Sequence, residues 1–183
     1  MARDGRGLIS NRRPIADRPE IVDQRSRLGE WEVDTLISKG HQRAIVSIVD
    51  RKSCHTMLRL VDAKTAEDVA RACSSALGSI THQVHTLTVD NGKEFAHHQD
   101  IERNINAPVY FADPYCSWQR GTNENVNELL RQYVPKSRPL SSITEEELHS
   151  IELQLNSRPR KKLGYKTSIE VYFLERVSVA LSN

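Results

Sequence analysis

The chain has 183 residues, of which 38% are hydrophobic and 27% charged, and its formal net charge is +2. This length allows one domain with a real core but is too short for two. Cys54, Cys73 and Cys116 are odd in number and far apart, which fits neither a disulfide framework nor a zinc site and indicates a reducing compartment. The sequence has no apolar stretch of membrane-spanning length and no signal-peptide core at its start. We therefore predict a cytoplasmic protein without a membrane partner.

The first 28 residues are rich in Arg, Gly and Pro and show no hydrophobic periodicity. Such a composition favours an extended basic arm or the remnant of a linker over part of a core. Globular structure is expected to begin near Gly29, so residues 29–183 are predicted to form the domain.

Three strands are predicted at the start of this domain. GEWEVDTLIS, which contains Asp34, has the pattern of a strand, and alternation places Asp34 on the face opposite Val33 and Thr35. The next segment, QRAIVSIVD, is an apolar run interrupted by Ser47, which is typical of a strand covered on both faces. CHTMLRLV follows a short polar turn, so an antiparallel meander is expected.

A helix is predicted next, because Thr65 can cap it with Asp68 three residues later. Its apolar stripe is formed by Ala66, Val69, Ala70, Cys73 and Leu77. The strand VHTLTVD then ends at Asp90 before an Asn-Gly turn, and a strand reached through a helical crossover is normally parallel to its neighbour. Further elements are expected as a helix over 94–106, a short strand in PVYFA, and helices near 119–133 and 144–156.

Three acidic residues suggest the chemistry of the chain. Asp34 lies inside one predicted strand, Asp90 ends another, and Glu124 stands at the start of a later amphipathic helix. Like charges brought together repel and raise one another's pKa values. Divalent cations that prefer oxygen ligands relieve this cost, and Mg²⁺ is usual where phosphates are the substrate. The three acids therefore predict a metal-dependent enzyme of phosphodiester chemistry.

The residues around these acids resemble a known family. ADPYCSWQRGTNENVNELLRQYVPK, followed by LNSRPRKKLGYKTSIEVYF, is similar to the catalytic core of the insertion-sequence-thirty family of bacterial transposases, over roughly residues 8–175. The resemblance implies a D-D-E enzyme with the ribonuclease-H-like fold of retroviral integrases, and its catalytic and metal-binding triad falls on Asp34, Asp90 and Glu124. Val33 stands where the family pattern suggests glycine, and Glu128 stands where a small residue is usual.

The resemblance also implies an architecture and a mechanism. The fold class is α/β, with a ribonuclease-H-like mixed five-stranded sheet flanked by helices, in which the strands of Asp34 and Asp90 are neighbours. Two Mg²⁺ or Mn²⁺ ions per site would stabilise the attacking and leaving oxygens of an in-line displacement at phosphorus. Asp34 would bind both ions, Asp90 one and Glu124 the other. Water would be the nucleophile for nicking and a DNA 3′-hydroxyl for strand transfer.

Other residues are candidates for DNA contacts. Trp118, Arg120, Asn123, Asn127 and Arg131 stand just before the Glu124 helix or on it, where they could meet unpaired bases or phosphates. Packing beneath the helix remains an equal alternative for Trp118. Residues 156–166 hold five basic side chains and no acid, and Arg158, Arg160, Lys161 and Lys162 are candidates for the DNA backbone. A solvated face is the alternative for this run.

Three functions remain open from the sequence. The first is a transposase core that cuts transposon ends and joins them to target DNA, acting as a homo-oligomer on DNA. The second is a ribonuclease-H-like nuclease without strand transfer. The third is an inactive, truncated transposase that only binds DNA. The resemblance also leads us to expect a helix-turn-helix region ahead of the core, and nothing in this sequence resembles one, so the chain is expected to be a fragment.

Overall fold

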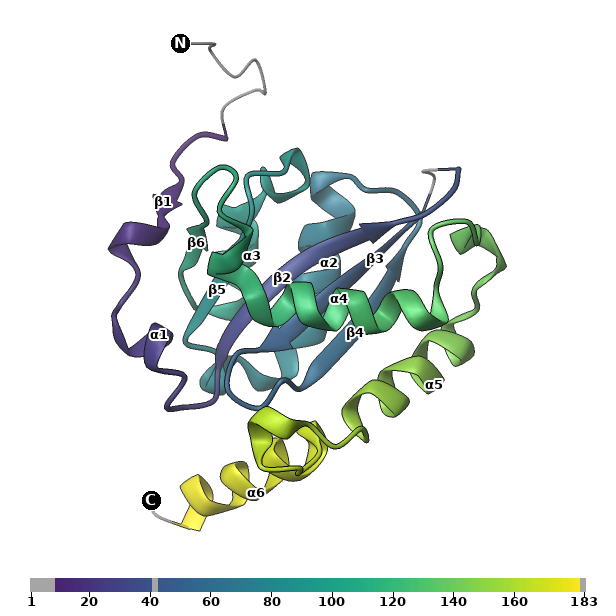
Figure 1. Ribbon diagram of the computed structural model, residues 1–183. Helices are drawn as coiled ribbons and strands as arrows, with labels where there is room; N and C mark the ends of the chain where they lie inside the picture. The colour runs from purple at the N-terminus through teal and green to yellow at the C-terminus, as the bar shows by residue number, and fades with distance from the viewer. Residues whose placement is uncertain (1–8, 41–42, 182–183) are drawn as a thin grey trace.

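A mixed sheet of six strands, in the order β1-β6-β5-β2-β3-β4, lies at the centre of the computed structural model, which describes residues 9–40 and 43–181 (Figure 1). The strands are β1 (Arg13–Pro14), β2 (Glu30–Ile37), β3 (Ala44–Asp50), β4 (Thr56–Val61), β5 (Thr86–Val89) and β6 (Val109–Phe111). β2, β3 and β4 form the predicted antiparallel meander, and β5 runs parallel to β2 as the crossover predicted. The sixth strand, β1, was not expected, because two residues of an Arg- and Pro-rich segment carry no strand pattern.

Helices cover both faces of the sheet. The view of Figure 1 shows α4 crossing in front of the sheet and α2 behind it. The helices are α1 (Ile21–Gln24), α2 (Ala66–Leu77), α3 (His98–Ile105), α4 (Gly121–Tyr133), α5 (Glu145–Asn156) and α6 (Ser168–Leu181). Short 3₁₀ turns are η1 (Ile15–Asp17), η2 (Gly78–Gln83), η3 (Lys93–Phe95), η4 (Ser117–Arg120), η5 (Leu140–Ser142) and η6 (Lys161–Leu163). Over the described ranges, no helix is both long enough and apolar enough to span a membrane.

The alternation of side chains along β2 separates two hydrophobic cores. Trp31 and Val33 belong to the core beneath α2 and α3, whereas Leu36 belongs to the core beneath α4 and α5. Because neighbouring residues of a strand point to opposite faces, Glu32 and Asp34 lie on the side covered by α4. This placement brings two carboxylates under the helix that carries Glu124.

Local signals in the sequence explain several helix boundaries. The Thr65 hydroxyl accepts a hydrogen bond of 3.1 Å from the backbone N–H of Asp68, so the predicted cap of α2 is confirmed. The helix predicted over 94–106 is a 3₁₀ turn followed by α3. α6 was not predicted from the sequence. Its Tyr172 stacks on His55 with ring centroids 4.3 Å apart and meets the edge of Trp31, so α6 is part of the domain.

The N-terminal segment contacts the domain over its described part, residues 9–28. β1 pairs in parallel with β6, and the Arg18 guanidinium donates a 2.9 Å hydrogen bond to the Thr88 hydroxyl of β5. The segment then runs along the β6 side of the sheet into α1 (Figure 1). The division of the chain at residue 28 into an arm and a domain stays a prediction. The contacts described here attach residues 9–28 to the sheet.

Candidate active site

Asp34 and Asp90 come from adjacent parallel strands. β2 and β5 pair from Glu30↔Thr86 to Glu32↔Thr88, so Asp34 lies two residues beyond the last pair and Asp90 directly follows β5. Both carboxylates therefore stand near the carboxyl end of the parallel pair, the position at which open α/β sheets present ligand-binding groups. The sequence predicted this neighbourhood, and the strand pairing confirms it.

One arginine lies between these two carboxylates. The Arg120 Nη1 atom is 3.3 Å from the Asp34 Oδ2 atom, and its Nη2 atom is 3.5 Å from the Asp90 Oδ2 atom. The Arg120 side chain is only 8% exposed, and it also donates to the backbone carbonyl of Val33. The two acids therefore converge on a single positive charge.

Glu124 reaches the same region from α4. It stands in the first turn of the helix and, with Asp34, lines a pocket of about 370 Å³. Asn127, Glu128 and Arg131 also line this pocket. Within the described residues, no three His, Cys, Asp or Glu side chains form a group with the spacing of metal ligands. The site thus brings Asp34 and Asp90 to one cation and places Glu124 at the pocket that Asp34 borders.

The Asp34 carboxyl is held on several sides. Its Oδ1 atom accepts a 2.8 Å hydrogen bond from the backbone N–H of Thr35, and its Oδ2 atom accepts one of 3.1 Å from the Asn127 amide. Burial raises the pKa of Asp34 above its ordinary value; the Arg120 charge opposes this rise, and the Asp90 charge adds to it. The Asp90 charge is therefore close enough to act on the Asp34 carboxyl.

Ser47 organises the amides of α4. Its hydroxyl lies 2.9 Å from the Oδ1 atoms of both Asn123 and Asn127, and it faces Asp34 across the β2–β3 ladder. Asn123 is fully buried, and its Nδ2 atom donates to the backbone carbonyls of Glu32 and Ser47. Sequence reasoning did not identify Ser47 as a site residue. Its signal was present, because it is the one polar residue inside an apolar run flanking the Asp34 strand.

A buried ion pair holds the start of α4. The Glu32 carboxylate accepts a 2.7 Å hydrogen bond from the backbone N–H of Asn123 and pairs with the Arg51 guanidinium at 2.6 Å. Arg51 also donates to the Gln119 carbonyl just before the helix. It contacts the Asp23 carboxylate and the Val22 carbonyl of α1 as well. A polar network therefore joins the N-terminal segment to the first turn of α4, and no local pattern of the sequence predicted it.

Val33 and Glu128 are the two departures from the family pattern. The Val33 side chain points away from the carboxylates, and Glu128 lies at the surface. The Val33 side chain is fully buried in the core beneath α2 and α3, on the face opposite Asp34. Only its backbone carbonyl approaches the site, where it accepts from Arg120. Glu128 is exposed on α4 at the rim of the pocket. Neither side chain occupies the space between Asp34 and Asp90.

The candidate DNA-binding residues separate by burial. Trp118 is 71% exposed just before α4, so it does not pack beneath the helix. Arg158, Lys161 and Lys162 are also exposed. In contrast, Arg160 is buried and donates to the Leu155 carbonyl, and burial lowers its pKa. Like Asn123, Arg160 therefore has a structural environment that does not suit a direct DNA contact.

Arg131 and Asn127 are half-buried, between the exposed and the buried candidates for DNA contacts. Arg131 lines the pocket with Glu124, while its guanidinium donates to the Ile37 carbonyl at 2.7 Å and so fixes the end of β2 against α4. Burial lowers the pKa of Arg131. Asn127 lies beside Asp34, and its contact orients that carboxylate. Both residues border the site, but each is engaged with the protein itself.

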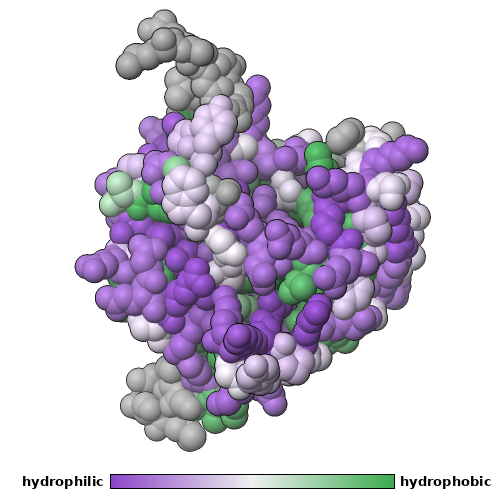
Figure 2. All heavy atoms as spheres, in the orientation of Figure 1, coloured by the Kyte–Doolittle hydropathy of each residue, from purple (hydrophilic) through white to green (hydrophobic). Residues whose placement is uncertain are grey.

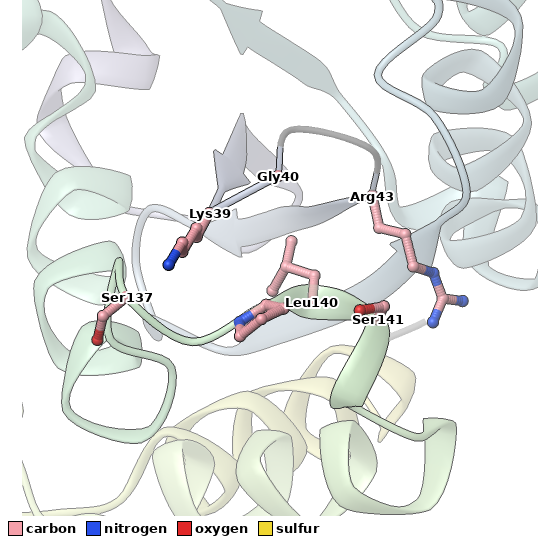
Figure 3. Close-up of a pocket in the computed structure, with 7 residues that line it drawn as sticks. Lys39, Gly40, Arg43, Ser137, Leu140 and Ser141 are labelled. Atoms are coloured by element: carbon pink, nitrogen blue, oxygen red, sulfur yellow. The ribbon is translucent and has the colours of Figure 1, made fainter.

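A second pocket, of about 430 Å³, lies just beyond the C-terminal end of β2. It is lined by Lys39, Arg43, Ser137 and Ser141, among others, around Leu140 (Figure 3). The Arg43 guanidinium pairs at 3.0 Å with the carboxylate of Asp62, the residue directly after β4. The sequence did not point to this pocket, because its walls come from the β2–β3 hairpin and from the loop after α4.

Comparison with known proteins relates the chain to transposases of bacterial insertion sequences. The chain is 44% identical over 181 residues to the transposase for insertion sequence element IS4351 of Bacteroides fragilis, covering 98% of this chain and 56% of that protein. It is 41% identical to the transposase InsI for insertion sequence element IS30C of Escherichia coli (strain K12), covering 97% of this chain and 46% of that protein. The chain spans about half the length of the curated relatives it matches.

Solved structures show the same fold. The catalytic core domain of BIV integrase superimposes with a TM-score of 0.62 at 20% identity, covering 83% of this chain and 98% of that domain. At this identity the likeness shows the fold, which is the predicted ribonuclease-H-like one. No protein-family model matches the chain. The relatives confirm the resemblance seen in the sequence motifs: over the region that they match, the chain is similar to transposases of bacterial insertion sequence elements.

Proposed function

We propose that this chain is the catalytic core of a DNA transposase that cleaves phosphodiester bonds and transfers DNA strands. The observation that carries the proposal is the convergence of Asp34 and Asp90 on one cationic group, with Glu124 at the pocket that Asp34 lines. Asp34 and Asp90 come from neighbouring strands and would repel each other unless a cation lay between them, and Glu124 on α4 lines the pocket that Asp34 borders. The family relationship supports the same chemistry.

The donor set suits a divalent cation of the magnesium type. The carboxylate oxygens of Asp34 and Asp90 already face a single positive charge, and oxygen ligands are those that Mg²⁺ and Mn²⁺ prefer. We propose that Asp34, Asp90 and Glu124 hold two such ions. Bound there, the ions would supply Lewis acidity for attack of water or a DNA 3′-hydroxyl at phosphorus.

The surrounding residues position these carboxylates. Asn127 and the Thr35 N–H fix the orientation of Asp34, and Ser47 holds Asn127 in turn. Glu32 anchors the first turn of α4, which carries Glu124. Rigid placement of this kind is what a site needs to hold reacting groups within a fraction of an ångström.

DNA is proposed to approach the face of α4, with several copies of the chain acting together on it. This face is mainly hydrophilic in the view of Figure 2. Trp118 offers an exposed ring for stacking on an unpaired base, and Arg158, Lys161 and Lys162 offer exposed charge for phosphates.

A joining assay tests the proposal. A labelled duplex with a free 3′-hydroxyl, incubated with supercoiled plasmid, protein and Mn²⁺, is expected to become covalently attached to the plasmid. Nicked plasmid without attached label would indicate a nuclease that does not transfer strands. Absence of both products from a folded, metal-loaded protein would contradict the proposal.

Removal of metal is expected to abolish cleavage. Activity should return with Mg²⁺ or Mn²⁺, whereas Ca²⁺ should bind and support little chemistry, because its larger and looser coordination does not match an in-line phosphoryl transfer site. Plasmid nicking measured after chelation and then in each metal checks this. Cleavage that persists in excess chelator would show that the carboxylates act without metal.

The exposed basic run is expected to bind DNA electrostatically. Replacing Arg158, Lys161 and Lys162 with alanine should weaken binding equally for element ends and unrelated DNA. Because each neutralised phosphate releases counterions, the plot of log affinity against log salt should lose roughly 0.9 of slope per contact removed. Arg160→Ala is unsuitable for this purpose, since the buried Arg160 supports the fold. Fluorescence anisotropy at several salt concentrations measures the slope; an unchanged slope would place the DNA contacts elsewhere.

A further inference from the structure

Arg120 occupies an unusual position for a residue expected to contact DNA. Its two terminal nitrogens face the Oδ2 atoms of Asp34 and Asp90, one each, at 3.3 and 3.5 Å. Its Nε atom is buried without a hydrogen-bond partner among the described residues. The guanidinium is therefore held by the two acids and the Val33 carbonyl, and its hydrogen-bonding capacity is only partly used.

This arrangement gives the pair of carboxylates a counterion inside the protein. Two partly buried carboxylates without a cation would repel each other, and a buried charge without a partner is strongly destabilising. Arg120 relieves both costs at once, because one guanidinium can satisfy two carboxylates through its separate nitrogens. The chain can therefore fold with Asp34 and Asp90 in place before any ion binds.

The same position is the one a divalent ion shared by Asp34 and Asp90 would require. Such an ion binds oxygens at about 2.0–2.1 Å, whereas the Arg120 nitrogens stand between the two Oδ2 atoms at hydrogen-bonding distances. The guanidinium and the ion carry like charge and compete for the same oxygens.

We propose that Arg120 is an internal counterion of Asp34 and Asp90, and that it leaves these carboxylates when a divalent cation binds. This rests on the proposed metal-dependent function. Arg120 immediately precedes α4, so its side chain remains beside the site after the exchange. Its released guanidinium is then available for a DNA phosphate, with which it can form a charge-assisted hydrogen bond. Metal loading would in this way precede the DNA contact of Arg120.

Mn²⁺ binding to the DNA-free protein tests the exchange. Isothermal titration of unmodified protein, Arg120→Met and Arg120→Lys is expected to show binding at least about tenfold tighter for Arg120→Met, because the competing charge is gone. Arg120→Lys keeps the charge and should stay close to the unmodified protein. In chelator, Arg120→Met should melt at a lower temperature, and added Mn²⁺ should raise its Tm more than that of the unmodified protein. Binding by folded Arg120→Met that is no tighter than normal overturns the proposal.

A measurement on the unmodified protein needs no substitution of Arg120. The side-chain N–H signals of Arg120 in a ¹⁵N-labelled sample, assigned by their loss in Arg120→Lys, are expected to shift and broaden as Mg²⁺ is added. Arg120 signals that stay fixed while the backbone amides of Asp34 and Asp90 shift overturn the exchange. Mn²⁺ binding by Asp34→Asn and Asp90→Asn distinguishes a failure of the Arg120 exchange from a failure of the proposed metal-dependent function. If both bind Mn²⁺ as the unmodified protein does, the ion lies elsewhere and the metal assignment itself fails.

Discussion

Asp34→Asn, Asp90→Asn and Glu124→Gln are each expected to lower DNA cleavage by about a thousandfold or more, with the fold retained. Such a loss corresponds to about 4 kcal/mol of transition-state stabilisation, which is the scale expected when a ligand of a catalytic metal is removed. The measurement is the rate of plasmid nicking in Mn²⁺, with circular dichroism to confirm folding.

Glu128→Gln is the matched control for this series. It removes the same charge one helical turn after Glu124, at the rim of the same pocket, but Glu128 is exposed. Its cleavage rate is expected to stay within about threefold of normal, since an exposed charge is screened by water and salt. A loss as large as that of Glu124→Gln would mean that Glu128 shares the catalytic role, and full activity of Glu124→Gln would remove it from the site.

Arg120 also changes what these substitutions do to stability. Crowding of like charges alone would predict that Asp34→Asn raises the Tm of the metal-free protein. However, Asp34 is paired with Arg120 at 3.3 Å, so the substitution removes an attraction together with a repulsion. We therefore expect no rise in Tm for Asp34→Asn in chelator. Differential scanning calorimetry decides between the two expectations.

Arg51→Met is expected to destabilise the domain by about 3–5 kcal/mol, because it leaves the fully buried Glu32 carboxylate without its cation. Burial lowers the pKa of Arg51, and the neighbouring Glu32 carboxylate opposes this effect. Urea unfolding measures the change in the free energy of unfolding. Since Glu32 also anchors the start of α4, hydrogen exchange at Asn123 should become faster.

Arg71→Met provides the control for the loss of an arginine. Arg71 pairs with Glu67 at 3.0 Å on the exposed face of α2, where both side chains are largely in water. Its removal should cost no more than about 1 kcal/mol, because surface ion pairs contribute little. Equal effects of Arg51→Met and Arg71→Met would show that the buried network does not support α4.

The N-terminal segment gains a role from the same network. Arg51 donates to the carbonyl of Val22 and contacts the carboxylate of Asp23, so α1 is tied to the ion pair that anchors α4. Composition indicated only an extended arm, because Arg51 and Thr88, which Asp23 and Arg18 contact in the domain, lie far away in the chain. Contacts of this kind appear only when distant residues are brought together.

The sequence by itself determined the main elements and the first assignment of the site. Alternation in the Asp34 strand, the Thr65 cap and the helical crossover before Asp90 are local patterns, and each survives in the structure because it depends on nearby residues. The family motifs added the ribonuclease-H-like fold. These signals sufficed to predict that the strands of Asp34 and Asp90 are neighbours.

Only the tertiary structure decided which of the polar residues predicted to contact DNA are buried. Arg120, Asn123 and Arg160 are polar residues that the sequence assigned to DNA, yet all three are buried. Conversely, Trp118 is apolar and exposed. Burial depends on which elements pack over a side chain, and that is set by contacts between residues far apart in the chain. The physical reason is that the chemical type of a side chain determines which groups it can bind, whereas tertiary packing determines which of those groups lie within contact distance.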